Sequence, residues 1–195
     1  MAVEKVRCGW CLGSDAYKAY HDEEWGRAQH DDGVLFEFLI LEGAQAGLSW
    51  STILGKRDGY RRVFAKFDAT KLARWDDDCL EKALLDTGIV RNRLKVWSVR
   101  TNARAFLAVQ KEFGSFDRYL WNWVDGKPVL NARKDLKEVP ARTELSDRIS
   151  KDLLKRGFKF VGSTIIYAYL QAMGVVNDHV VDCHRYPRKA ARAAG

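Results

Sequence analysis

The chain has 195 residues, of which 47% are hydrophobic and 30% are charged. At roughly 150 residues per domain, this length predicts a single domain, and the hydrophobic fraction excludes disorder as its main character. No apolar run approaches the ~20 residues of a membrane helix, and the opening MAVEKVRCGWC lacks the apolar core of a secretory signal. We therefore expect a cytoplasmic, monomeric protein with one domain over residues 1–187 and a basic, disordered tail at 188–195.

The formal net charge of +7 is unevenly distributed along the chain. Residues 1–60 carry six Lys or Arg and ten Asp or Glu, whereas residues 61–195 carry 27 and 16. A basic C-terminal two-thirds suggests a polyanionic partner, although charge alone favours an ordinary solvated surface. The four cysteines of a protein without a secretion signal do not favour disulfides, which leaves metal binding or plain burial.

Apolar residues recur at helical spacing along almost the whole chain. Asp31 or Asp32 can cap a helix over 34–46, and Ser49 can cap one that runs through Leu54. Three more helices are predicted over 76–86, 91–113 and 115–124, and the first of them ends before a glycine.

Residues 124–140 hold two of the three prolines and predict a loop. Two helices follow over 146–156 and 163–173, each with a serine at the cap position and a glycine at its end. Because no segment alternates Val, Ile and Thr as a strand would, the predicted fold class is all-α.

Candidate metal ligands lie near both ends of the chain: Cys8, Cys11 and His21 on one side, and His179 and Cys183 on the other. The last two are four residues apart, which on a helix places both on one face. Zinc suits mixed imidazole and thiolate ligands. The residues alone leave two sets open, Cys8–Cys11–His179–Cys183 or a set in which His21 replaces Cys11. We favour zinc over ordinary buried thiols, and either set would tie the two chain ends together.

Glu37 and Glu42 interrupt the otherwise apolar segment VLFEFLILEGAQAGLSW. Five residues apart, they cannot share a helix face, so one can meet solvent while the other points inward. A buried carboxylate is costly unless it is paired, which makes the inward glutamate a functional candidate. Aromatic residues usually serve the core, but Trp10, Trp25 and Trp50 flank this segment, and such rings around one Glu can hold a flat cationic ring.

Two basic segments are candidates for binding DNA. Residues 87–111 contain six Lys or Arg and no acid. Four side chains of this segment share one face of the predicted helix: Arg93, Trp97, Arg100 and Arg104. Further on, the segment GFKFVG at 157–162 joins two predicted helices and exposes backbone N–H groups beside Lys159, which can bind a phosphate. This pattern is typical of a helix-hairpin-helix, although a generic helical turn has it too.

Five segments carry a family resemblance: RCGWC, AYHDEEWG, LILEGAQAGLSW, TGIVRNRLK and KRGFKFVGSTIIYAYLQAMGVVNDHVVDC. Together they resemble 3-methyladenine DNA glycosylase I, from Cys8 to about Pro187. The resemblance implies a helix-hairpin-helix glycosylase fold with a structural zinc ion between the terminal segments. It also implies base-excision repair of alkylated double-stranded DNA, with free 3-methyladenine and an abasic site as products.

The resemblance assigns the zinc ligands to Cys8, His21, His179 and Cys183, which decides against Cys11. It places the base pocket on one catalytic carboxylate and four aromatic rings, with the carboxylate ionised: Glu42, Tyr20, Trp50, Trp10 and Trp25. It places the strand-invading turn on Gly47 and Leu48. The hairpin that grips the phosphate falls on residues 158–162 and the following serine, with these DNA-binding residues: Lys159, Phe160, Val161, Gly162 and Ser163.

Many helix-hairpin-helix glycosylases carry a catalytic Asp shortly after the second helix. In this chain that position falls on Asn177, and Asp178 lies one residue further on. We therefore expect no standard catalytic base, and Asp178 can instead be a partner for a metal ligand. The rival interpretations are a non-enzymatic DNA clamp and a glycosylase for another damaged base. A clamp has no use for Glu42 among aromatic rings.

Overall fold

The computed structural model describes residues 5–187, so the tail predicted at 188–195 lies outside the described part. The described chain is mostly helical, and none of its helices is long and apolar enough to cross a membrane. The α-helices are α1 (Asp15–Glu23), α2 (Asp32–Gln45), α3 (Trp50–Val63), α4 (Ala69–Leu72), α5 (Asp77–Leu85), α6 (Arg93–Phe113), α7 (Phe116–Trp121), α8 (Glu144–Lys155) and α9 (Ser163–Ala172). Short 3₁₀ turns are η1 (Gly9–Cys11), η2 (Ala65–Phe67), η3 (Asn122–Val124) and η4 (Leu136–Glu138).

Side-chain caps start every α-helix of residues 5–187 except α9, and most of the predicted starts are confirmed. Asp31 accepts a hydrogen bond from the N–H of Val34, as Ser49 does from Thr52. The predictions that Ser146 and Ser163 are N-caps are wrong. Thr143 is the N-cap of α8, and Gly162, which has no side chain to form a cap, is that of α9. The Ser146 hydroxyl accepts from the Thr143 N–H in return, which makes a capping box.

The all-α prediction needs one correction, since two short strands pair in parallel. They are β1 (Val129–Leu130) and β2 (Val176–Asn177), and β1 lies within the predicted loop over 124–140. Strands of two residues are too short to show an alternating pattern. The pairing fixes this loop against the segment that follows α9. Helices α1 and α4 were also not predicted.

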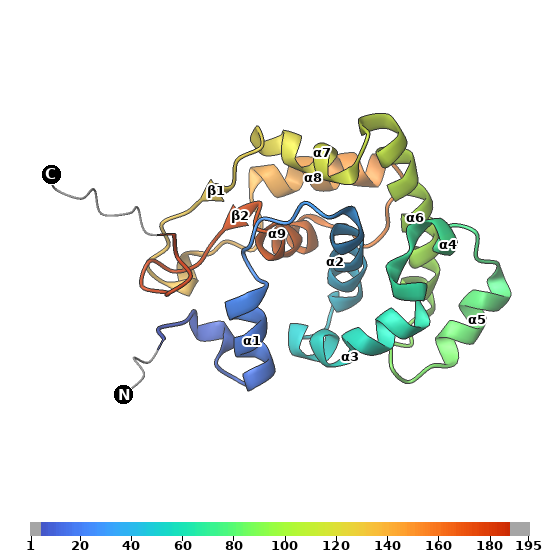
Figure 1. Cartoon of the computed structure of the whole chain (residues 1–195), viewed down its shortest axis with the longest axis horizontal. Coiled ribbons are helices and arrows are strands. Elements are labelled where there is room, and N and C mark those ends of the chain that lie inside the picture. Colours follow the sequence, from blue (N-terminus) through green and yellow to red (C-terminus); the bar gives the residue numbers. More distant parts are fainter. Residues whose placement is uncertain (1–4, 188–195) are drawn as a thin grey trace, which may run out of the picture.

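Helix α2 lies in the middle of the molecule, with α9 beside it, while α5 and α6 lie on one side and α1 on the other (Figure 1). Residues 35–44 of α2 are all buried, as expected of a helix that is apolar on nearly every side. The Tyr169 hydroxyl on α9 donates to the Leu35 carbonyl oxygen at 3.1 Å. The central position of α2 places its two glutamates inside the protein.

Two glycines of α3 have opposite surroundings, which gives a test of the packing. A Cβ atom at Gly59 would lie 2.2 Å from the carbonyl oxygen of Gly88, whereas one at Gly55 would have nothing within 4 Å. We expect Gly55→Ala to raise the free energy of unfolding by about 0.5–1 kcal/mol through helix propensity. Gly59→Ala should lower it by about 1–3 kcal/mol, because the backbones must separate. Urea unfolding measures both, and equal gains would contradict the close contact.

Candidate active site

A cavity of about 410 Å³ lies between η1, α1, α2 and α9. Its volume falls in the range of about 300–1,000 Å³ that is usual for small-molecule pockets. The lining residues are Trp10, Tyr17, Tyr20, Trp25, Glu42, Gln45, Trp50, Leu136, Val139, Ala168, Gln171 and Asp178. All five side chains predicted for the base pocket are therefore brought together, and the others were not predicted as pocket residues.

Aromatic rings form most of one wall of the cavity. The Tyr20 and Trp50 ring centroids lie 5.3 Å apart, and those of Trp10 and Trp25 lie 5.0 Å apart in an edge-to-face arrangement. Trp10 also contacts Tyr17, at 5.3 Å between centroids. Rings held at these angles leave their faces and edges open to a planar ligand.

Glu42 is the buried carboxyl group of this cavity. Glu42 is only 3% exposed to solvent. Its Oε2 atom has no hydrogen-bond partner within residues 5–187. Desolvation raises the pKa of this carboxyl group to about 8. The indole Nε1 of Trp50 is likewise buried without a partner in the described structure. An orphaned acceptor and an orphaned donor beside one cavity point to a polar ligand.

The structure decides which of the two glutamates of α2 is free. Contrary to the expectation that one meets solvent, Glu37 is also buried, at 8% exposure. Its carboxylate accepts from Arg57 Nε at 2.6 Å and pairs with Arg61 at 2.9 Å. Arg57 also pairs with Glu24 at 2.7 Å. Glu37 is therefore a neutralised structural charge, and Glu42 is the carboxyl group available to a ligand.

Asp178 forms part of the cavity wall and is fully engaged. Its carboxylate accepts from Asn131 at 2.8 Å, from Gln171 at 2.8 Å, from Arg133 at 3.3 Å and from the Tyr167 hydroxyl. These four donors occupy its lone pairs, so it does not have the free acceptor that a catalytic base needs. The alternative that Asp178 is a partner for a metal ligand is not what its contacts indicate.

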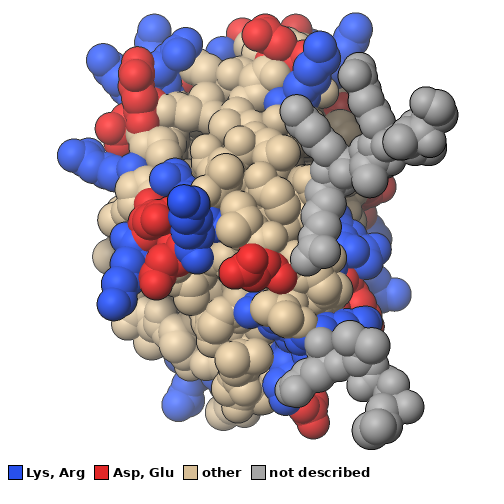
Figure 2. All heavy atoms as spheres, turned by 90° about the vertical axis from the view of Figure 1, so that its left-hand side faces the viewer, with Lys and Arg blue, Asp and Glu red and all other residues tan. Residues whose placement is uncertain are grey.

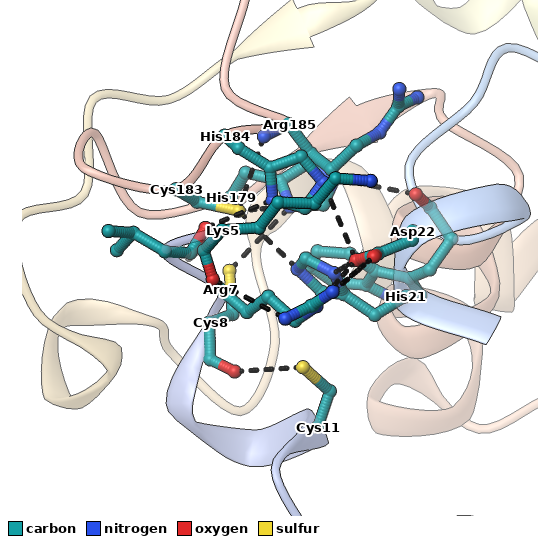
Figure 3. Close-up of polar contacts among 12 residues, drawn as sticks. Lys5, Arg7, Cys8, Cys11, His21, Asp22, His179, Cys183, His184 and Arg185 are labelled. Atoms are coloured by element: carbon teal, nitrogen blue, oxygen red, sulfur yellow. Dashed lines mark hydrogen bonds and ion pairs between the residues drawn. The ribbon is translucent and has the colours of Figure 1, made fainter. Parts of the chain in front are cut away.

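Four buried side chains from the two ends of the chain point toward one another (Figure 3): Cys8, His21, His179 and Cys183. Their ligand atoms all lie within 4.8 Å of one another. The sulfur–nitrogen distances are 3.5 Å for Cys183–His21 and 3.6 Å for both sulfurs to His179 Nδ1. An ion about 2.3 Å from sulfur and about 2.0 Å from nitrogen would hold such pairs about 3.6 Å apart in a tetrahedron. The cluster therefore fits a metal ion.

The structure chooses between the two ligand sets that the spacing left open. The Cys11 thiol donates to the Cys8 carbonyl oxygen at 3.1 Å and points away from the cluster (Figure 3). The helix geometry that would place His179 and Cys183 on one face is not found. His179 comes directly before a turn in which the Cys183 N–H donates to the Val180 carbonyl. The turn brings the two ligands together as a helix would.

Neighbouring groups fix the orientation of both imidazoles, and sequence reasoning missed them. Asp22 Oδ1 lies 2.8 Å from His21 Nδ1, which leaves Nε2 for the cluster. Although burial opposes it, hydrogen bonds from Arg7 and His21 lower the pKa of Asp22 to about 2. His179 Nε2 lies 3.3 Å from the Trp25 carbonyl oxygen. An acid adjacent in sequence to a candidate ligand was the one available signal for Asp22.

The two cluster thiols differ in acidity because they interact. The interaction with Cys8 lowers the pKa of the Cys183 thiol, and the same interaction raises the pKa of Cys8. His179 and His21 also stabilise the Cys183 thiolate. A thiolate held by two imidazoles is the state in which cysteine binds a metal.

The turn after α2 carries Gly47 and Leu48 at the surface. Gly47 has a φ of +76°, which favours glycine. The Leu48 N–H donates to the Gln45 carbonyl at 2.6 Å, and the Leu48 side chain is 42% exposed. Exposure alone does not distinguish Leu48, since Leu85 is 77% exposed. Its place on the tight turn that follows α2 makes it the candidate for entering a duplex.

The segment between α8 and α9 forms a tight hairpin. Lys159 and Gly162 are exposed, whereas Val161 is buried, so Val161 can offer a ligand only its backbone. The Ser163 hydroxyl is already bonded to Ser146 and Asp147. Phe160 has a φ of +56°, a conformation that is rare for a residue with a side chain.

The predicted basic face of α6 is mostly engaged within the protein. Arg100 pairs with Asp77 at 2.8 Å, and Arg104 donates to the Ala73 carbonyl at 2.8 Å. Arg93 lies 4.1 Å from the centroid of the Trp97 ring. These contacts favour a structural role for the face. On the face that carries α1, uncharged surface fills the upper centre, acidic side chains lie directly below it, and most Lys and Arg lie toward the edges (Figure 2).

Comparison with known proteins agrees with this geometry. The chain matches the methyladenine glycosylase family over residues 10–186. It is 46% identical over 181 residues to DNA-3-methyladenine glycosylase 1 of Escherichia coli strain K12, an alignment that covers 93% of this chain and 97% of that protein.

Two solved structures share the fold. A crystal structure of 3-methyladenine DNA glycosylase I superposes with a TM-score of 0.91 at 45% identity and covers 93% of this chain and 100% of the other. A variant of 3-methyladenine DNA glycosylase I in complex with 3-methyladenine has a TM-score of 0.91 at 31% identity, over 94% and 99% of the two chains. The chain belongs to the methyladenine glycosylase family.

Proposed function

We propose that the protein removes 3-methyladenine from alkylated double-stranded DNA in base-excision repair, as a monofunctional hydrolase that leaves an abasic site. The observation that carries the proposal is the buried, unpartnered carboxyl group of Glu42 in a cavity walled by aromatic rings. A cavity of this kind suits a planar base that carries positive charge.

Charge provides the selectivity for the damaged base. Methylation at N3 makes the adenine of the nucleoside a cation, and a desolvated cation–π contact adds about 2 kcal/mol for a charged ring. With a pKa of about 8, Glu42 is mostly protonated at neutral pH before a cation arrives. A cation beside it favours the carboxylate, which then attracts the base and accepts a hydrogen bond from it. Normal adenine is neutral and receives neither contribution.

The lesion reaches the cavity by rotating out of the duplex. Flipping costs a few kcal/mol, and less for a damaged base. Leu48 fills the vacated space as an apolar wedge, and stacking on Trp50 returns about 1–3 kcal/mol. The hairpin holds a phosphate of the same strand through backbone N–H groups near Gly162 and through the side chain of Lys159. This is the role of the hairpin in the helix-hairpin-helix assignment that we propose for α8 and α9.

The protein does not need to protonate the base, because the methylated base already carries a positive charge and is a good leaving group. The bond between the sugar carbon and the base nitrogen breaks, and its electron pair neutralises the base. Water adds to the sugar carbon and releases a proton to solvent. No lysine amine is assigned as a nucleophile, so the strand stays intact. The saturated carboxylate of Asp178 holds the pocket wall through Gln171 and Tyr167, and does not act as a base.

We also propose that the ion of the Cys/His cluster is zinc and that its role is structural. Bound there, it neutralises the thiolates and joins the N-terminal segment to the segment after α9. The cluster lies directly behind the cavity wall, since the His179 and Trp25 rings are 4.6 Å apart and Trp10 contacts His21. The metal ligands therefore support two rings of the base pocket.

Replacing Glu42 by Gln tests the function directly. Since an amide cannot become an anion, we expect single-turnover release of 3-methyladenine from methylated duplex DNA to fall about 100-fold or more. Binding to undamaged duplex should persist. The matched control is Glu37→Gln, a buried glutamate of the same helix, which should lower the stability by about 3 kcal/mol but leave release intact. Normal release by Glu42→Gln would remove Glu42 from the mechanism.

The pH dependence of stability tests the protonation state of Glu42. Its folded-state pKa of about 8 lies above the ordinary value of 4.5, so the unfolded chain loses the proton first as the pH rises. The wild-type free energy of unfolding should therefore fall by up to about 1.4 kcal/mol per pH unit relative to Glu42→Gln between pH of about 5 and 8. Urea unfolding at several pH values measures this difference, and parallel profiles for the two proteins would contradict it.

Metal analysis tests the cluster. Wild type purified without chelators should contain about one zinc per chain. Cys183→Ser should lose most of it, with a loss of stability of about 3 kcal/mol or more, because metal loss is among the largest single-residue effects. Cys11→Ser should keep both the zinc and the stability. Loss of zinc in Cys11→Ser with retention in Cys183→Ser would overturn the ligand set.

A non-enzymatic clamp that uses the hairpin alone was the rival interpretation of the sequence, and membership of the glycosylase family argues against it. It is distinguished by binding of free 3-methyladenine, which the clamp has no reason to show. Tight duplex binding with no binding of the free base would favour the clamp.

A further inference from the structure

Lys95, in the first turn of α6, makes two contacts that its surface position alone does not predict. Its ammonium group donates to the carbonyl oxygens of Ala44 at 2.8 Å and of Ala46 at 2.6 Å. Both carbonyls belong to the C-terminal end of α2, where helix geometry leaves them without partners. The side chain is half-buried, and desolvation lowers the pKa of the amine. A positive charge at the C-terminal end of α2 also interacts favourably with the helix dipole, whose negative end lies there.

Asn102 makes a matching contact two turns further along the same face of α6. Its side-chain amide donates to the Lys159 carbonyl oxygen at 3.0 Å and its oxygen accepts from the Lys159 N–H at 2.7 Å. The residue is 2% exposed. The two bonds hold the backbone of the hairpin just before Phe160, the residue in the left-handed conformation.

The end of α2 and the hairpin also approach each other directly. A Cβ atom at Gly43 would lie 3.1 Å from the Phe160 Cβ and 3.3 Å from its carbonyl oxygen. Lys95, Asn102, Gly43 and Phe160 border the same small internal gap. One face of α6 and one glycine contact therefore fix the distance between the turn that carries Leu48 and the hairpin.

We propose that Lys95 and Asn102 are positioning residues that set the spacing between the Leu48 turn and the hairpin before DNA binds. The inference rests on the proposed function, in which Leu48 enters the duplex while the hairpin holds a phosphate. Both elements must engage one strand at once, so a fixed spacing avoids an ordering cost on binding. Neither residue is among those that line the cavity, and free base should bind without them.

The test replaces Lys95 by Met and by Arg, with Lys111→Met as the control. Lys111 lies on the same helix and is exposed, and its replacement by Met removes the same charge as Lys95→Met does. We expect Lys95→Met to slow single-turnover release from methylated duplex by about 10- to 100-fold, the range for lost hydrogen bonds to a charged group. Affinity for free 3-methyladenine, followed by tryptophan fluorescence, should stay within about twofold. Lys95→Arg should recover most of the release, and Lys111→Met should resemble wild type.

Salt dependence separates positioning from a direct phosphate contact. A lysine that binds a phosphate contributes about 0.9 to the slope of log affinity against log salt concentration. We expect this slope to be unchanged in Lys95→Met while duplex affinity falls. A slope reduced by about one, or a release rate equal to that of Lys111→Met, would overturn the proposal.

Asn102→Asp keeps the acceptor for the Lys159 N–H, but it loses the donor and sets a carboxylate oxygen against the Lys159 carbonyl. It therefore loosens the hairpin contact. It should slow release from the duplex and leave free-base affinity within about twofold. Wild-type release rates from the variant would overturn the role of Asn102. If wild type itself released no base, the proposed function would fail, an outcome distinct from equal rates in wild type and variants.

Discussion

The Glu42 carboxyl group lies out of water with one oxygen unpartnered within residues 5–187. Such a position costs free energy, and burial raises the pKa of the group to about 8. By contrast, the buried carboxylates of Glu37 and Asp178 are neutralised or saturated by neighbours. Protonation removes the charge but leaves the oxygen without a partner, and a cation or a hydrogen-bond donor in the cavity would provide one. In the proposed function, the same unfavourable burial that weakens the fold provides selectivity for a charged base.

The surroundings of the cavity are rigid by several independent means. His179 bonds to the Trp25 carbonyl from the Cys/His cluster, and Asp178 holds Gln171 from the opposite side. Helix α6 holds the two loops that we expect to contact DNA. Its Lys95 side chain bonds to the end of α2, where the Leu48 turn begins. Base recognition and duplex recognition thus use different supports. A substitution can impair one and spare the other, which makes the two separable by experiment.

The sequence predicted those features that depend on residues close together in the chain. Capping by Asp31 is read from adjacent residues, and the structure confirms it. The family resemblance supplied the cluster ligands, whereas spacing alone left two sets open. The residue pattern could not decide between Glu37 and Glu42, because the decisive partner, Arg57, comes from another helix. The resemblance alone pointed to Glu42. The short strand pair and the contacts of Lys95 were missed for the same reason: each depends on residues brought together only by folding.

The most direct test of the account is single-turnover release of free 3-methyladenine from methylated duplex DNA by the metal-loaded wild-type protein. The account predicts release of the free base, with the abasic strand unbroken until it is treated with alkali. Folded, metal-loaded protein that binds the duplex and releases no 3-methyladenine would contradict it.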